Sequence, residues 1–392
     1  MITTTGKDIV AKYLIGQTTA YASYLALGCG AKPRIEDTAE DPFISGDING
    51  FLAKKSLDFE MFRVPIISKG YISEGGVSKV IFTAELPTTD RYAITEIGVY
   101  PALNNPVANQ DSFNIFSFTT DEGWKYNDTT ADTDIPSITG GIDLSTSVLD
   151  AATNTDIGPI FQTNVDNATL NAEARSYRNE QLRMSANAIY VRGNFSTISF
   201  SGNVPTLGGK YMTLTGANTN LAKANPTDEL RLAMSVISKS EADTQIPDSV
   251  NVVIQFVTSV NGEYASVKNT ISSPAISGGG FGVGNRYAVS SVALGDSNFY
   301  KTNNFSWDLV TSVRVYVNAL KSGYATSDYW IGLDGLRLEN LSDVSPVYGL
   351  AAYSTLRHSS YSTGSAVEYA TPIVKPLNTS GLVEFKFALD VG

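Results

Sequence analysis

Short runs in which apolar and polar residues alternate recur along this chain, and each predicts a β-strand with one buried face. They follow an opening segment, residues 5–15, whose apolar residues recur at helical spacing, with Thr4 or Thr5 as the expected N-cap. Gly, Pro, Asn or Asp residues bound most of the runs. The strands predicted before residue 119 are 22–27, 57–67, 79–86, 91–100 and 113–118.

One of these runs breaks its own alternation. Leu57, Phe59 and Met61 are apolar with acidic residues between them, but Met61 is followed directly by Phe62. An extra residue in one strand of a pair produces this change of phase, so we predict a β-bulge at Met61–Phe62.

Glu96 interrupts the apolar run AITEIGVYP, residues 93–101. Two interpretations are open. In one, the carboxylate pairs with a backbone donor or faces a neighbouring molecule. In the other, it faces solvent on an alternating strand, and the alternation favours this second interpretation.

Residues 119–188 have a different character. The stretch is rich in Asp, Thr, Asn and Ser and its periodicity is weak, so we predict a polar linker or arm. A short helix is expected within it, over residues 168–184. The acidic residues lack the spacing of a calcium-binding helix–loop–helix.

From residue 189 to 341 the pattern is regular and predicts about eight short strands separated by turn residues. This pattern is typical of an antiparallel β-sandwich, and we expect a jelly roll. The predicted strands are 189–192, 197–200, 211–215, 230–238, 250–258, 287–294, 313–317 and 330–338.

The last run, residues 383–391, alternates cleanly and is too short to be a domain. We expect it at the edge of the N-terminal sheet, which makes the sandwich an insertion. The predicted fold is therefore mainly β. A small α+β attachment domain is built from residues 1–118 with 345–392, a linker covers 119–188, and a jelly-roll sandwich covers 189–344.

Composition narrows the function classes. The formal net charge is −11 and no basic tract is present, which argues against nucleic acid and anionic membranes as partners. No apolar run approaches the roughly 18 residues of a membrane span. The start of the chain lacks a basic stretch followed by an apolar one, so we expect synthesis and folding in a cytoplasm.

Few residues suit catalysis or metal binding. Cys29 is the one cysteine and His358 the one histidine, and most catalytic triads and zinc sites need a histidine. We interpret Cys29 as a buried thiol and His358 as a polar loop residue. The sequence therefore predicts a protein that is not an enzyme and has no cofactor.

The first hundred residues resemble the N-terminal domain of tail-collar fibre and related baseplate proteins of tailed phages. Three segments carry the resemblance, namely ITTTGKDIVAKYLIG, YASYLALGCGA and ITEIGVYP. The resemblance implies a virion structural protein, made in the host cytoplasm, whose partners are other virion proteins and copies of itself.

The 189–341 region resembles carbohydrate-binding modules with a jelly-roll fold, through its closing run YWIGLDGLRLE. Asp334 matches the Asp that often lies near a structural calcium in such modules, although Gly335 stands where a second acidic or amide residue is usual. Sugar rings stack on exposed aromatic side chains. Phe281 and Tyr300, beside turn-rich stretches, are the candidate contacts for a glycan or a protein partner.

Together these patterns predict a structural component of a tailed-phage virion, in the tail, baseplate or neck, that displays a jelly roll. An adhesin that binds host surface glycan is the alternative. A glycan-degrading enzyme is a second alternative, but the sequence places no pair of carboxylates for hydrolysis.

Overall fold

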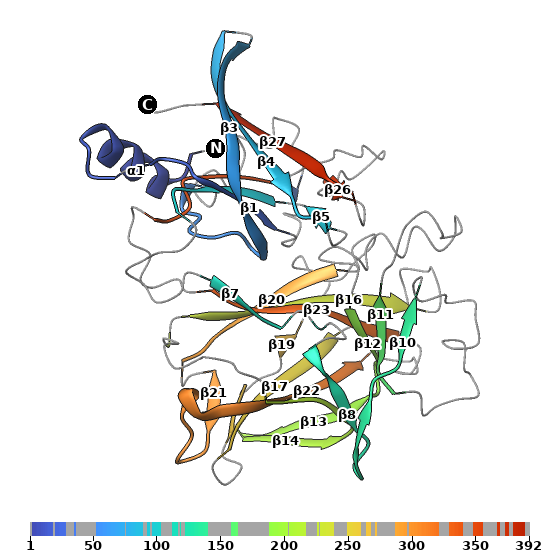
Figure 1. The fold of residues 1–392 in the computed structure, drawn as a ribbon. Coiled ribbons are helices and arrows are strands. Elements are labelled where there is room, and N and C mark those ends of the chain that lie inside the picture. The colour runs from blue at the N-terminus through green and yellow to red at the C-terminus, as the bar shows by residue number, and fades with distance from the viewer. Residues whose placement is uncertain are drawn as a thin grey trace. The chain divides into compact units, whose positions relative to one another are not determined.

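Figure 1 shows a computed structural model of the chain, which divides into two compact units, Met1–Phe113 with Glu339–Gly392, and Asn114–Leu338. The structure describes residues 2–18, 20–28, 35–36, 52–74, 76–88, 92–94, 96–102, 112–116, 118, 122–139, 158–163, 188–202, 204–216, 226, 228–238, 249–259, 264–267, 271–272, 287–295, 298–320, 329–339, 348–355, 367–368, 373–375 and 379–388. Cys29, Phe281, His358 and the helix predicted at 168–184 lie outside these residues.

In the first unit, both ends of the chain contribute strands to one six-stranded antiparallel sheet. Its order is β24 (Ala352–Thr355), β6 (Glu96–Tyr100), β1 (Tyr24–Gly28), β3 (Glu60–Glu74), β4 (Val77–Leu86) and β27 (Gly381–Ala388). Two further pairs also join the two ends of the chain, β2 (Ile35–Glu36) with β25 (Val367–Glu368) and β5 (Tyr92–Ile94) with β26 (Ile373–Lys375).

The final alternating run lies where the sequence predicts it. β27 forms the edge of the sheet and pairs with β4 along its whole length, with Phe385 opposite Phe82. Val383 and Phe385 are buried while Glu384 and Lys386 are exposed, as the alternation requires. The prediction that this strand completes the N-terminal sheet is confirmed.

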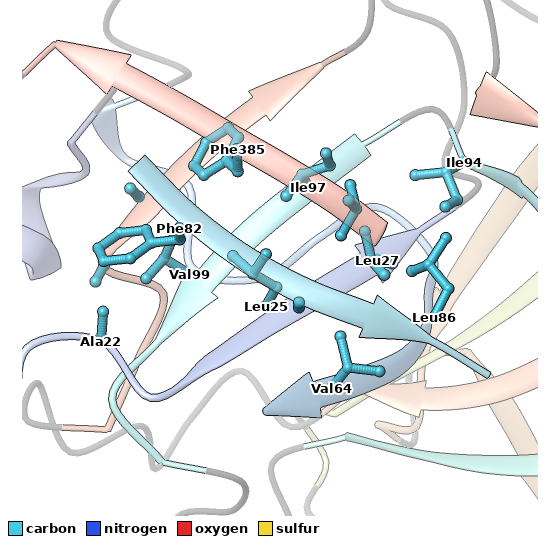
Figure 2. Packing of buried hydrophobic residues seen from close by; sticks show 14 of the residues in the cluster. Ala22, Leu25, Leu27, Val64, Phe82, Leu86, Ile94, Ile97, Val99 and Phe385 are labelled. Atoms are coloured by element: carbon cyan, nitrogen blue, oxygen red, sulfur yellow. The ribbon is translucent and has the colours of Figure 1, made fainter. Parts of the chain in front are cut away.

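The core of this unit lies against one face of the sheet. Figure 2 shows Leu25 and Leu27 of β1 packed with Ile97 and Val99 of β6 and with Phe385 of β27. The helix α1 (Thr4–Leu14) belongs to the same core through Ile9, which is fully buried. Burial of this helix face stabilises α1 beyond its intrinsic propensity.

The helix begins one residue earlier than the sequence predicts. Thr3, and not Thr4 or Thr5, is the N-cap, and its Oγ1 accepts a hydrogen bond from the Gly6 N–H at 2.9 Å. The same hydroxyl donates to the Leu350 carbonyl, and the Thr3 N–H donates to the Ala351 carbonyl at 3.1 Å. Hydrogen bonds to Leu350 and Ala351, which are distant in the sequence, make Thr3 the N-cap. The local sequence around the helix start cannot reveal such partners.

The predicted β-bulge is confirmed. The pairing of β1 with β3 passes from Leu27 opposite Phe62 to Gly28 opposite Glu60, so Met61 is the extra residue. A second shift occurs between β3 and β4, where Ile66 and Ser68 pair with successive residues and Ile67 is the extra one. Ile67 is 58% exposed.

The second unit is a β-sandwich, and Figure 1 shows its two sheets as layers. One sheet has the order β10 (Ser137–Thr139), β11 (Ile160–Thr163), β12 (Ala188–Arg192), β23 (Tyr329–Glu339), β16 (Glu229–Ser238) and β20 (Tyr287–Ala293), and β7 (Ser112–Phe116) also pairs with β23. The other has the order β21 (Phe299–Lys301), β18 (Tyr264–Val267), β17 (Ser249–Thr258), β22 (Val310–Leu320), β15 (Tyr211–Thr215), β8 (Lys125–Asn127) and β9 (Asp132–Asp134), with β19 (Ile271–Ser272) on β17.

A hairpin of β13 (Ser196–Ser201) and β14 (Val204–Gly209) and the 3-10 turn η4 (Trp307–Leu309) complete the described elements of this unit. All eight strands predicted between 189 and 341 are present, with ends that differ by a few residues at most. The chain is thus mainly β, and the predicted antiparallel sandwich is confirmed, with β10 and β11 as a parallel pair within it.

The stretch predicted as a polar linker or arm, 119–188, differs from that prediction in its described part. It contains β8, β9, β10 and β11, and these strands belong to the two sheets of the second unit. β8 pairs with β15, and β11 pairs with β12. The strands are short, and β8 (KYN) and β9 (DTD) consist mostly of polar residues, so the hydrophobic pattern did not show these two.

Candidate functional site

Glu96 is a nearly fully buried carboxylate of the first unit. It begins β6 with its side chain 1% exposed, on the opposite face of the sheet from the large core. Its Oε1 accepts a hydrogen bond from the Phe59 N–H at 2.7 Å, and its Oε2 accepts from the Asp58 N–H at 2.8 Å. The Tyr353 hydroxyl donates to Oε2 at 3.1 Å.

The interpretation of Glu96 as partner of a backbone donor is therefore confirmed, and the solvent-facing one is wrong. The error has a physical cause. The segment around Asp58 and Phe59 donates its N–H groups to the face of the sheet that carries Glu96. Alternation along β6 cannot reveal that another part of the chain covers this face.

Two glycines make room for this segment. Gly28 lies opposite Glu96 in the sheet, and a Cβ there would lie 2.5 Å from Glu96 Oε1 and 2.6 Å from the Phe59 carbonyl oxygen. At Gly98 a Cβ would lie 2.5 Å from Leu57 Cδ1 and 2.6 Å from Leu350 Cδ1. The Glu and the Gly of the TEIG segment thus serve one purpose, which is to bind residues 57–59 against β6.

An ion pair lies beside Glu96 in the same segment. Asp58 forms an ion pair with Lys54, whose Nζ also lies 5.3 Å from the centre of the Tyr353 ring. Burial of Glu96, together with the nearby Asp58 carboxylate, raises the pKa of Glu96 to about 7. The site holds backbone in place and titrates near neutrality.

This pKa predicts how stability depends on pH. Glu96 keeps its proton in the folded state up to about pH 7, whereas its ordinary pKa is 4.5, so the folded state binds more protons between these values. Stability should therefore fall as pH rises through this range, by on the order of 3 kcal/mol in total. Urea unfolding at pH 5 and pH 8 measures the difference, which we expect to be much smaller in Glu96→Gln.

An unchanged difference in Glu96→Gln would show that other groups cause the pH dependence. Glu85→Gln, an exposed carboxylate on β4, is the matched control and should keep the wild-type dependence.

A second candidate site is a face of the larger sheet in the sandwich. Strand register places Gln255 of β17 opposite Arg314 of β22 and opposite Ser266 of β18, and Ser266 opposite Tyr300 of β21. Residues paired across strands or two apart along a strand share a face. This face, here called the tyrosine face, comprises Tyr211, Gln255, Tyr264, Tyr300, Arg314 and Tyr316.

The aromatic rings of the tyrosine face lie in two pairs with an arginine beside one of them. The Tyr264 and Tyr300 ring centres are 5.9 Å apart, and those of Tyr211 and Tyr316 are 5.2 Å apart. The Arg314 guanidinium lies 5.2 Å from the Tyr211 ring and donates to Gln255 Oε1 at 3.5 Å. Burial raises the pKa of Tyr316, against the effect of Arg314.

The other face of the same strands is core. Phe299 and Lys301 alternate with Tyr300 and point to the opposite side, where Trp307 lies. Trp307 makes edge-on contacts with Phe299 at 5.7 Å and with Phe256 at 5.3 Å, and Lys301 Nζ lies 5.6 Å from its ring centre. Trp307 is half-buried on this opposite side and is therefore not part of the tyrosine face.

Of the residues predicted from sequence, Tyr300 lies on the tyrosine face and is half-buried. Phe281 lies outside the described residues, and Asp334 lies within β23 with its side chain outside them. The other members, such as Tyr211, Arg314 and Tyr316, were not predicted. Their signal was the alternation of 211–215 and 313–317, which places them on one side of their strands, but only the strand order brings them to Tyr300.

The described part of the chain contains no group of three or more His, Cys, Asp or Glu residues placed to hold a metal ion. Within that part, no helix is both long and apolar enough to cross a membrane.

No protein-family model matches the sequence, and no curated protein matches it. One solved structure with some likeness is an exo-β-1,3-galactanase from Phanerochaete chrysosporium, determined with galactose. It is 14% identical, the match covers 72% of this chain and 59% of the galactanase, and the TM-score is 0.16. A TM-score this low carries no argument about fold or activity. The matched part of this chain spans 59% of the galactanase's length.

Proposed function

We propose that this chain is a structural component of a tailed-phage virion, in the tail, baseplate or neck. One observation carries the proposal. The three segments that resemble tail-collar and baseplate proteins fold as α1, β1 and β6 of one unit, together with the last strand of the chain. A unit closed by both chain ends can anchor in a particle while the residues between them form a separate displayed domain.

Exposed apolar residues support an assembling role for this unit. At the end of α1, Tyr13 is 50% exposed, Leu14 77% and Ile15 68%. Three consecutive large apolar residues at a surface favour contact with another protein. The partners proposed are other virion proteins and further copies of this chain.

The test is to locate the chain in particles. Gold-labelled antibody against the sandwich should bind purified particles of the phage that encodes the chain, at the tail, baseplate or neck. Mass spectrometry of the same particles should detect the chain in a constant amount per particle. A chain present in the infected cell but missing from purified particles would contradict the proposal.

The tyrosine face favours a second function, which is recognition of a host surface glycan by the displayed domain. Half-buried rings can stack on the apolar face of a sugar, while an arginine binds its hydroxyl groups. Tyr264, Tyr300 and Arg314 are half-buried and supply these groups on one sheet face, and the buried Gln255 accepts a hydrogen bond from Arg314. This role is compatible with the first, because the displayed domain of a virion protein can bind the host.

We expect Tyr300→Ala to weaken glycan binding by about threefold to tenfold, the effect of losing one ring contact. A glycan array identifies the ligand, and titration of the wild type and the variant with it measures the change. Tyr71→Ala, an exposed tyrosine of β3 in the other unit, should bind like the wild type. Absence of any array ligand would count against this second function and leave the virion proposal intact.

A further inference from the structure

β27 is the outermost described strand on its side of the six-stranded sheet. It has 8 residues and pairs with β4 on its inner side over all of them. A strand in this position can accept another strand on its outer side by extending the ladder of backbone hydrogen bonds. Proteins that do not use such an edge usually shorten it, bend it, cover it, or place charged residues or prolines in it.

The side chains of β27 are self-complementary. Val383 and Phe385 lie on the core side, 4% and 5% exposed. On the other side, Glu384 and Lys386 have side chains 51% and 47% exposed and form an ion pair at 2.9 Å within the strand. Opposite charges therefore flank one apolar residue, Phe385, at equal distances along the strand.

We propose that β27 pairs antiparallel with β27 of a second copy of this chain, about a two-fold axis through Phe385. In this register Glu384 of each copy lies opposite Lys386 of the other, and the axis repeats the contact, so two ion pairs form across the interface. On the core side, Phe385 lies opposite its own equivalent. The two sheets become one continuous sheet with its core extended across the axis.

Leu382 also fits this arrangement. It is 69% exposed, among the largest exposures of an apolar side chain in the described residues. The two-fold places it opposite Ala388 of the other copy, and a small residue there leaves space for the leucine. Charge complementarity thus selects a second copy as the occupant, because each charged residue of β27 meets the opposite charge when an identical strand runs antiparallel to it. The inference deepens the proposed assembly role, on which it rests, by naming the partner and the register.

The experiment uses two charge reversals in the full chain, Glu384→Lys and Lys386→Glu. Each variant alone places like charges opposite each other twice across the axis, so we expect each to raise the dimer dissociation constant roughly tenfold or more in analytical ultracentrifugation. Mixing the two single variants places opposite charges at every contact again, and should restore dimers of wild-type affinity that contain one copy of each.

The mixture separates contact between copies from contact within a strand. Both single variants lose the ion pair inside β27, so recovery on mixing can arise only from pairs across the axis. Lys125→Glu breaks the exposed Lys125–Asp134 pair in the sandwich and changes the net charge as Lys386→Glu does, so it is the matched control for that variant and should dimerise like the wild type. Circular dichroism checks that each variant is folded.

Three results would overturn the inference. These are a monomeric wild type, single variants that dimerise as the wild type does, and a mixture that fails to recover. Should a variant not fold, hydrogen exchange of the wild type gives the answer, because β27 amides must gain protection as concentration rises. A monomer that is nevertheless found in particles would reject this pairing and leave the virion proposal standing. A chain that dimerises through β27 but is missing from particles would support this pairing and contradict the virion proposal.

Discussion

Glu96→Ala should lower the free energy of unfolding of the first unit by about 3–5 kcal/mol, the largest effect expected for a single side chain here. The carboxylate accepts hydrogen bonds from two backbone N–H groups and from the Tyr353 hydroxyl. Alanine offers no acceptor, so these donors lose their hydrogen-bond partner where the site is buried. The missing side chain also leaves a cavity. Hydrogen exchange of peptides from 54–60, together with urea unfolding, measures the loss.

The comparison with Glu85→Ala makes this result specific. Glu85 is an exposed carboxylate of β4, opposite Leu382 of β27, and its removal should change the free energy of unfolding by less than about 0.5 kcal/mol. Equal effects of the two substitutions would show that Glu96 does not hold residues 57–59. Glu96→Gln should fall between them, because its amide keeps one acceptor oxygen but presents an N–H₂ group where a second acceptor is needed.

Gly6→Ala should be the second large effect, with a loss of about 1–3 kcal/mol and detachment of α1 from residues 350–351. A methyl group at Gly6 would overlap the carbonyl oxygen of Ala351, which is backbone and cannot rotate away. The side chain of Ile2 would also lie 2.9 Å from the added carbon. Alanine is otherwise the better helix former, so any loss measures the contact.

Gly70→Ala is the matched control for this prediction. Gly70 lies in β3, and the nearest atom to an added Cβ is Ile81 Cβ at 3.8 Å, an ordinary contact. We expect no loss of stability there. Thermal unfolding followed by circular dichroism compares the two variants, and a Gly6→Ala protein as stable as the wild type would show that α1 packs less closely than described.

The sequence alone predicted most strands because alternation is a local property. The bulge at Met61 and the final strand were both found from the spacing of apolar residues. The cap at Thr3 and the four strands within 119–188 were not predicted, since distant partners create them. Short polar strands carry no hydrophobic pattern of their own.

The candidate sites were less predictable for the same reason. Glu96 stood out as a charged residue in an apolar run, but its donors come from a segment 37 and 38 residues away along the chain. Tyr300 was chosen for its neighbouring turns, yet Arg314 and Tyr316 reach its face only through the order of β17, β18, β21 and β22. A single sequence shows which residues are unusual and leaves open which of them meet.

The pairing of β27 with β4 has a consequence for synthesis. Phe82 can pair with Phe385 only after the ribosome has synthesised the whole sandwich, which lies between these two residues in the sequence. Pairings this far apart in sequence form late, and domains near the start of a chain otherwise fold first. A chain interrupted before residue 381 leaves β4 as a bare edge, so the first unit is completed only in molecules whose inserted domain has already been translated. The sheet of the first unit is therefore complete only in chains that also contain the inserted domain.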